Sequence, residues 1–244
     1  MPRKEPGSRP QGRARRDAQA RAPERPPGRR GTGARAVAAV RRWVVTAPGT
    51  YLWLGVLFAT TVVARQMSPD FEEEFLRDRS TNLHELSRNP VRVLISSALW
   101  IDGGRWLPYA VLFTLFHATA EHWLGTRRWL AVTALAHVLA TLVSEGALAW
   151  AIRYGHAPPS AADTLDVGVS YGLAGVIAVL TYRVPRLWRY AYAFAVLVVY
   201  GVPLLGDGRT FTDLGHFTAV LIGLACYPLT RRRTARETKR PAAQ

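Results

Sequence analysis

Cysteine is almost absent from this chain of 244 residues, and long stretches of its centre carry no charge. The one cysteine, Cys226, excludes an intrachain disulfide and a zinc site built from cysteines. Lysine occurs only at Lys4 and Lys239, so nearly all 32 basic residues are arginine, which is typical of a GC-rich bacterial genome. No H-E-x-x-H motif occurs either, so we expect neither a metal nor an organic cofactor.

The charge that is present lies mostly at the two ends of the chain. Residues 1–42 contain 13 Lys and Arg, residues 231–244 contain six more, and the formal net charge is +15. The first segment is rich in Arg, Pro, Gly and Ala and has no apolar period, so it cannot bury enough surface to offset its ordering entropy. We therefore predict two basic tails, the first of them disordered. Attraction to anionic lipid is enough to explain the two basic tails, so we expect no specific nucleic-acid partner.

Between the tails lie six apolar stretches that reach or approach the length a helix needs to cross a bilayer core roughly 30 Å thick. They cover residues 43–64, 106–124, 129–152, 167–182, 187–205 and 213–229. This pattern predicts an all-α membrane protein with six transmembrane helices over residues 43–230, in contact with the lipid bilayer. The long loop 65–105 ends in an apolar stretch from Pro90 that is too short to span, which indicates an interfacial helix.

The arginines also predict an orientation. If both termini are cytoplasmic, 24 of the 32 Lys and Arg residues fall in inside segments and 8 in outside ones. Cytoplasmic loops carry such an excess of basic residues. We therefore expect a multi-pass protein of the plasma membrane with both ends in the cytoplasm.

Two polar residues are predicted to lie at the same depth in the membrane. Ser170 and His216 are each the fourth residue of a span that runs from outside to inside, and small residues such as Gly172 and Gly223 permit close approach of the two helices. A serine hydroxyl that is hydrogen-bonded to an imidazole can attack a peptide carbonyl while the histidine takes its proton. The alternative is structural, because serine in a membrane helix commonly bonds its own backbone.

Other ionisable groups within the spans have structural interpretations. His117 and Glu121 share a helix face and, with His122 or His137, would offer ligands to zinc, as in a metal-dependent membrane hydrolase. His137 and Glu145 also share a face of the third span, so we expect them to pair with polar groups of a neighbouring helix. Buried groups of this kind also line proton or ion paths in some membrane proteins.

The order of these motifs resembles the rhomboid family of intramembrane serine proteases over residues 90–230. The similar stretches are Pro90-Val91-Arg92, Glu121-xxx-Gly125, Gly168-Val169-Ser170 and Gly215-His216 with Ala219 and Gly223. The resemblance implies a rhomboid-like bundle, with Ser170 as nucleophile and His216 as general base. It also implies a structural role for Glu121 and Gly125, and transmembrane helices as substrates or partners.

The chain departs from the family pattern at the catalytic positions. Tyr171 follows the serine where the family has glycine, and the positions of the two oxyanion donors fall on Arg105 and Tyr109. Loss of one oxyanion donor typically costs about 10²–10³ in rate. Two functions therefore stay open: an endopeptidase with a Ser-His dyad, or a catalytically inactive adaptor or chaperone that binds transmembrane helices.

Overall fold

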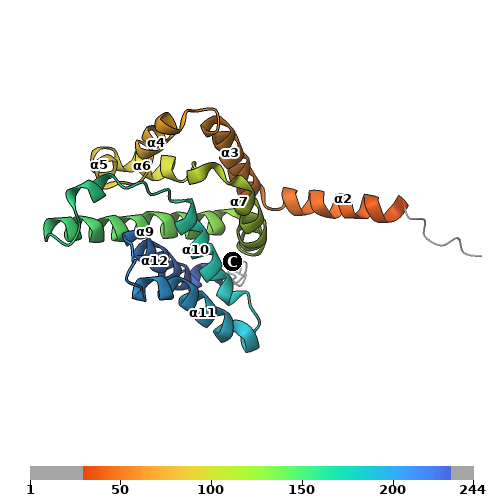
Figure 1. The fold of residues 1–244 in the computed structure, drawn as a ribbon. Coiled ribbons are helices and arrows are strands. Elements are labelled where there is room, and N and C mark those ends of the chain that lie inside the picture. The colour runs from red at the N-terminus through yellow and green to blue at the C-terminus, as the bar shows by residue number, and fades with distance from the viewer. Residues whose placement is uncertain (1–29, 232–244) are drawn as a thin grey trace, which may run out of the picture. The chain divides into compact units, whose positions relative to one another are not determined.

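The computed structural model describes residues 30–231, and this part of the chain is helical without a strand (Figure 1). The chain divides into two units, residues 1–43 and 44–244, which are described separately. The first unit contributes α2 (Arg30–Val45), so residues 30–42 are helical where the composition predicted disorder. Alanine and arginine are strong helix formers, and four alanines lie in this segment. The rest of the two predicted tails, residues 1–29 and 232–244, lies outside the described range.

The first observed helix of the bundle is shorter than the apolar segment that predicted it. Helix α3 covers Pro48–Ala64, not residues 43–64. Proline lacks the amide hydrogen that an interior helix position needs and disfavours helical geometry in the residue before it. Ala47 is accordingly non-helical, with φ −127° and ψ 59°, and Pro48 occupies the first turn of the new helix.

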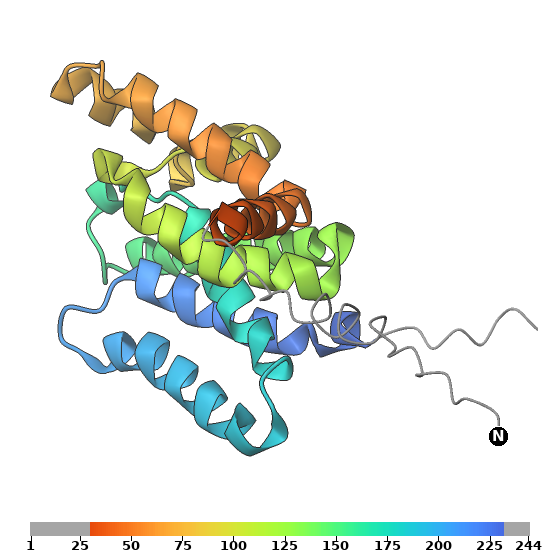
Figure 2. The same ribbon diagram turned by 90° about the vertical axis from the view of Figure 1, so that its right-hand side faces the viewer.

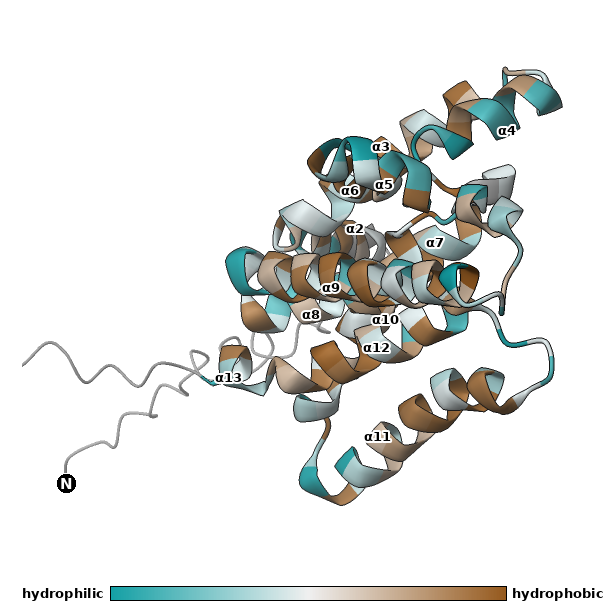
Figure 3. Cartoon of the chain, turned by 90° about the vertical axis from the view of Figure 1, so that its left-hand side faces the viewer, coloured by the Kyte–Doolittle hydropathy of each residue, from teal (hydrophilic) through white to brown (hydrophobic). Residues whose placement is uncertain are grey.

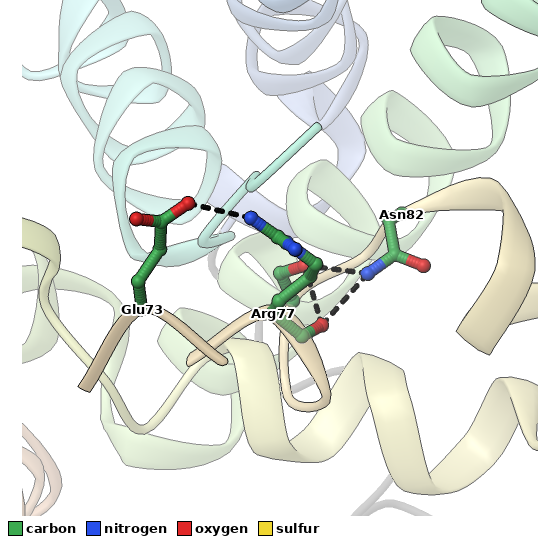
Figure 4. A network of polar contacts seen from close by, with 4 residues as sticks. Glu73, Arg77 and Asn82 are labelled. Carbon is green, nitrogen blue, oxygen red and sulfur yellow. Dashed lines mark hydrogen bonds and ion pairs between the residues drawn. The ribbon is translucent and has the colours of Figure 1, made fainter. Parts of the chain in front are cut away.

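The long loop 65–105 folds into three short helices, α4 (Pro69–Arg77), α5 (Leu83–Arg88) and α6 (Pro90–Ser97). A helix thus forms where the sequence from Pro90 predicted one. Asn82 caps α5 by accepting a hydrogen bond from the Glu85 amide at 2.9 Å, and its own amide donates to the Arg77 carbonyl at 2.7 Å (Figure 4). Arg77 also forms an ion pair with Glu73 at 2.5 Å. These contacts join the end of α4 to the start of α5.

Helices form at each of the other five predicted segments. In chain order they are α7 (Trp106–Leu112), the π-helix η2 (Phe113–His117), α8 (Ala118–Leu124), α9 (Thr126–Arg153), α10 (Val169–Val179), η4 (Leu180–Tyr182), α11 (Arg186–Gly201), η5 (Val202–Leu205), α12 (Phe211–Ala225) and α13 (Tyr227–Thr230). The short 3-10 helices η1 (Asp102–Gly104) and η3 (Pro159–Asp163) lie in the loops before α7 and before α10.

The lengths of these helices do not confirm six spans. Within the described residues, α9 and the continuous helix of α11 and η5 are long and apolar enough to cross a membrane, and α2 with α3 gives a third candidate if the pair is counted as one. The helices Val169–Tyr182 and Phe211–Ala225 are apolar but shorter. Six membrane crossings therefore stay a prediction, although all six segments are helical.

Helix α10 lies beside both α9 and α12 and is buried along almost its whole length (Figures 1 and 2). Small residues make this packing possible. A Cβ on Gly223 would overlap the carbonyl oxygen of Gly175, and a Cβ on Gly175 would overlap the Ala136 methyl group. Helix α11, by contrast, packs at the edge of the bundle, where only Val196 is buried. Apolar residues run along α9, α11 and α12 (Figure 3).

Replacement of Gly223 by alanine tests this packing. The added methyl group meets backbone that cannot move away, so we expect Gly223→Ala to lower the free energy of unfolding by about 1–3 kcal/mol. Gly146→Ala is the matched control, because a Cβ there meets nothing within 4 Å and alanine favours a helix over glycine. Thermal unfolding in detergent should rank Gly223→Ala below wild type and Gly146→Ala at or above it. Equal melting temperatures for the two variants would contradict the packing.

Candidate functional site

The Glu121 carboxylate joins the starts of two helices to α8. Its oxygens accept hydrogen bonds from the backbone amides of Gly49 and Thr50 at 2.9 and 2.7 Å, and from the hydroxyls of Thr50 and Thr126, each at 2.7 Å. The first amides of a helix have no partner within the helix and favour a negative charge. The residue before α3 does not cap the helix with its own side chain, and Glu121 of α8 caps it instead. Gly125, at φ +81°, lets the chain turn from α8 into α9.

The four candidate zinc ligands lie in separate polar networks. His117 is buried, and its Nδ1 accepts a hydrogen bond from the Trp129 indole at 3.0 Å. His122 contacts the Thr46 hydroxyl at 2.6 Å, and His137 contacts the Leu94 carbonyl at 2.8 Å. Over residues 30–231 no three His, Cys, Asp or Glu side chains gather closely enough to hold a metal ion. The zinc hydrolase hypothesis thus has no support from this geometry.

Ser170 and His216 lie near the starts of two packed helices, α10 and α12. Both are partly exposed. Within the described part of the chain, however, no hydrogen bond joins them. The α10 side chain that contacts His216 is Tyr171, whose ring centroid lies 4.9 Å from the imidazole in an edge-on arrangement.

Tyr171 fills the space between α10 and α12. Its ring is fully buried, and a Cβ on Gly215 would overlap the phenol. Its hydroxyl donates a hydrogen bond to Asp166 Oδ2 at 2.7 Å and lies 3.5 Å from the Ser144 hydroxyl. The tyrosine that replaces the glycine of the family motif is therefore a packed and hydrogen-bonded part of the site.

Asp166, which the sequence did not single out, joins the loop 65–105 to this site. Its backbone carbonyl accepts hydrogen bonds from the Thr81 amide at 2.9 Å and the Thr81 hydroxyl at 3.1 Å. Burial raises the pKa of the Asp166 carboxyl to about 6, an effect that hydrogen bonds from Tyr171 and Thr81 partly offset. Its position just before an apolar span was the only sequence signal.

The two oxyanion candidates have different surroundings. Arg105 is exposed and, together with Thr61 and Arg65 of the α3 end, lines a cavity of about 300 Å³. Tyr109 packs against Phe113, with ring centroids 6.4 Å apart, next to the core cluster that contains Val169. No described contact brings Arg105 to Ser170.

A second and larger cavity, of about 530 Å³, lies between α3, α6 and α9 and is lined mainly by apolar side chains. The indole nitrogens of Trp53 and Trp129 donate to the Ala98 carbonyl and to His117, so the apolar parts of both rings are left to line the cavity. Leu52, Ile95 and Leu130 at its edge are exposed. Figure 3 shows the apolar residues along α9. We call this cavity the lateral groove; no sequence pattern indicated it.

Comparison with known families shows which family model this chain matches. A family model described as "Rhomboid-like protein" matches residues 42–236, which include every helix from α3 to α13. No curated protein and no solved structure matches the chain.

Removal of the Glu121 charge tests the cap of α3. In Glu121→Gln an amide NH₂ would face groups that themselves donate hydrogen bonds, so we expect a loss of about 3 kcal/mol in the free energy of unfolding. Glu74→Gln, at an exposed position of α4, is the control and should unfold like wild type. Thermal unfolding in detergent measures both. Wild-type stability of Glu121→Gln would show that the carboxylate is dispensable.

Proposed function

We propose that this chain, which belongs to the rhomboid-like protein family, is a multi-pass membrane protein that binds transmembrane helices without cleaving them. The proposal places the protein in the bacterial plasma membrane with both termini in the cytoplasm, in line with the distribution of its arginines. Its role is then that of an adaptor or chaperone for other membrane proteins.

The observation that carries this proposal is the contact of Tyr171 with His216. A general base must lie within hydrogen-bond reach of the nucleophile whose proton it takes. Here the imidazole faces a phenol ring at 4.9 Å, and no hydrogen bond links it to Ser170 in the described structure. Because Tyr171 is itself held by Asp166 and packed on Gly215, a rotation of the ring away from His216 would break contacts on both sides.

The lateral groove supports helix binding. Its exposed edge residues come from three helices, and its floor contains two tryptophans whose polar atoms are already hydrogen-bonded. An occupant would therefore meet mainly apolar surface, although Thr133 Oγ1 and His137 Nδ1, on two of the lining residues, have no hydrogen-bond partner in the described structure. Side chains of a transmembrane helix fit this surface, because helices in lipid associate mainly through close packing.

The second candidate function is cleavage of transmembrane substrates, with Ser170 as nucleophile and His216 as base. What favours it is the position of both residues near the starts of adjacent helices, where each is partly exposed. Arg105 and Tyr109 would then have to replace the usual oxyanion donors.

Fluorophosphonate labelling of the full-length protein in lipid distinguishes the two functions. We expect no labelling at Ser170, because an unactivated serine reacts slowly. Ser170→Ala should leave helix binding unchanged. Labelling of wild type that disappears in Ser170→Ala and weakens in His216→Ala would establish the peptidase and reject our proposal.

Helix binding itself is measured with a labelled single-span Leu-Ala peptide in liposomes. A photo-reactive residue at Ile95, on the edge of the groove, should cross-link to the peptide, and Leu130→Trp, which narrows the groove, should lower the yield at least threefold. Leu221→Trp, at an exposed position of α12, is the matched control and should not lower it. Equal yields in the two variants would exclude the groove as the binding surface.

A further inference from the structure

The smaller of the two cavities described above lies between the end of α3 and the start of α7, which pack against each other, and the proposed function does not use it. Its volume is about 300 Å³, at the lower limit of ordinary ligand pockets and too small to seat a transmembrane helix about 10 Å wide. Charged and apolar side chains both line this cavity, among them Phe58, Val62, Arg65, Arg105, Trp106 and Leu107. We call it the arginine cavity.

The two arginines belong to the same end of this helix pair. Arg65 directly follows α3, and Arg105 directly precedes α7. The Nη2 group of Arg65 donates a hydrogen bond to the Gly104 carbonyl at 2.8 Å. Gly103 and Gly104 have φ +67° and +61°, a left-handed turn that favours glycine and leads directly into Arg105. The fold therefore ties the first arginine to the residue next to the second.

Both arginines have donors to offer to an anion. Their side chains are exposed, and in the described part of the chain neither guanidinium forms an ion pair with a carboxylate. Arg65 uses one N–H group for Gly104, and a guanidinium has five. Guanidinium groups match the oxygens of a phosphate, and two positive charges that line one cavity attract an anion. The charged end of the arginine cavity is therefore suited to a phosphate.

The remainder of the cavity wall is mainly apolar. The Trp106 indole N–H is already hydrogen-bonded to a backbone carbonyl at 3.1 Å, and its ring contacts Phe58 edge-on, with centroids 5.1 Å apart. Phe58, Val62 and Leu107 are exposed although they are apolar. Phe58 precedes Arg65 by seven residues, which corresponds to roughly 10 Å along a helix. Positive charge at one end and apolar surface further along α3 match a ligand with an anionic head and an apolar chain.

We propose that the arginine cavity binds one anionic phospholipid, with the phosphate on Arg65 and Arg105 and the start of an acyl chain on the apolar wall. In the orientation proposed above, both arginines lie at the outer surface of the membrane, at the level of the lipid headgroups. Phe58 then lies deeper, among the acyl chains. A free phosphate ion would make the contacts with the arginines but would leave the apolar wall uncovered. The proposal gives Arg105 a lipid phosphate as its partner in place of an oxyanion at Ser170.

The test uses the full-length protein, stripped of lipid in an uncharged detergent. We expect dioctanoyl-phosphatidylglycerol to raise the melting temperature with saturation, by about 5–10 °C at a hundredfold excess over its dissociation constant. Zwitterionic dioctanoyl-phosphatidylcholine and inorganic phosphate should each need at least a tenfold higher concentration for the same rise. Arg105→Gln should weaken the response to phosphatidylglycerol at least fivefold in concentration, and the double variant Arg65→Gln/Arg105→Gln should abolish it.

Arg153→Gln is the matched control. Arg153 is an exposed arginine at the end of α9, and its replacement lowers the net charge as much as that of Arg105 does. This variant should keep the wild-type response, which separates a built site from general attraction between arginines and lipid. If the double variant does not fold, native mass spectrometry in an equimolar mixture of the two lipids should show one phosphatidylglycerol retained on wild type and less of it on Arg105→Gln.

Three results would overturn the proposal: no saturable rise with phosphatidylglycerol, an equal response to phosphatidylcholine or to phosphate alone, or an unchanged response in Arg105→Gln. Neither the lateral groove nor a transmembrane peptide enters this experiment. Its failure therefore leaves the proposed function untouched, and a failure of helix binding leaves the lipid site untouched.

Discussion

The close packing of α10 against α9 and α12 is the constraint on which the rest of the structure depends. In lipid there is little hydrophobic gain from bringing helices together, so association relies on tight contact of small residues and on satisfied polar groups. Gly175 and Gly223 allow backbone atoms of α10 and α12 to approach where any side chain would collide. That approach fixes which face of α10 meets His216, and the face it presents carries Tyr171.

The polar groups divide the bundle into two ends with different chemistry. At one end Glu121 receives more donors than any other carboxylate in the described structure and connects the starts of α3 and α9 to α8. At the other end Asp166 accepts a hydrogen bond from the Tyr171 hydroxyl, whereas neither carboxylate oxygen of Glu145 has a hydrogen-bond partner in the described structure. The protein thus supplies donors to Glu121 and Asp166 and leaves Glu145 without them.

The sequence predicted the helical segments well because apolar length is a local property. It also singled out Glu121, Ser170 and His216. The first span was predicted too long because the apolar pattern outweighed Pro48, whose effect on a helix can be read from the sequence. The π-helix in the second span lies within an unbroken apolar pattern, which did not predict it. The prediction of disorder was wrong for residues 30–42, because it relied on composition and gave too little weight to the helix propensity of Ala and Arg. Asp166 and the lateral groove depend on contacts between distant segments, which no single stretch of sequence contains.

The replacement of the motif glycine by Tyr171 is not a single-residue change, because it depends on Gly215. A phenol fits after the serine only because the facing position on α12 is glycine, whose missing side chain leaves room for the ring. The hydroxyl then needs an acceptor in an apolar surrounding, and Asp166 provides it at 2.7 Å. A glycine at position 171 would leave a cavity of the size of a phenol and a buried aspartate without its donor. The tyrosine, the glycine and the aspartate therefore depend on one another. Together they pack α10 on α12 around a phenol ring that contacts His216, instead of around a serine–histidine hydrogen bond.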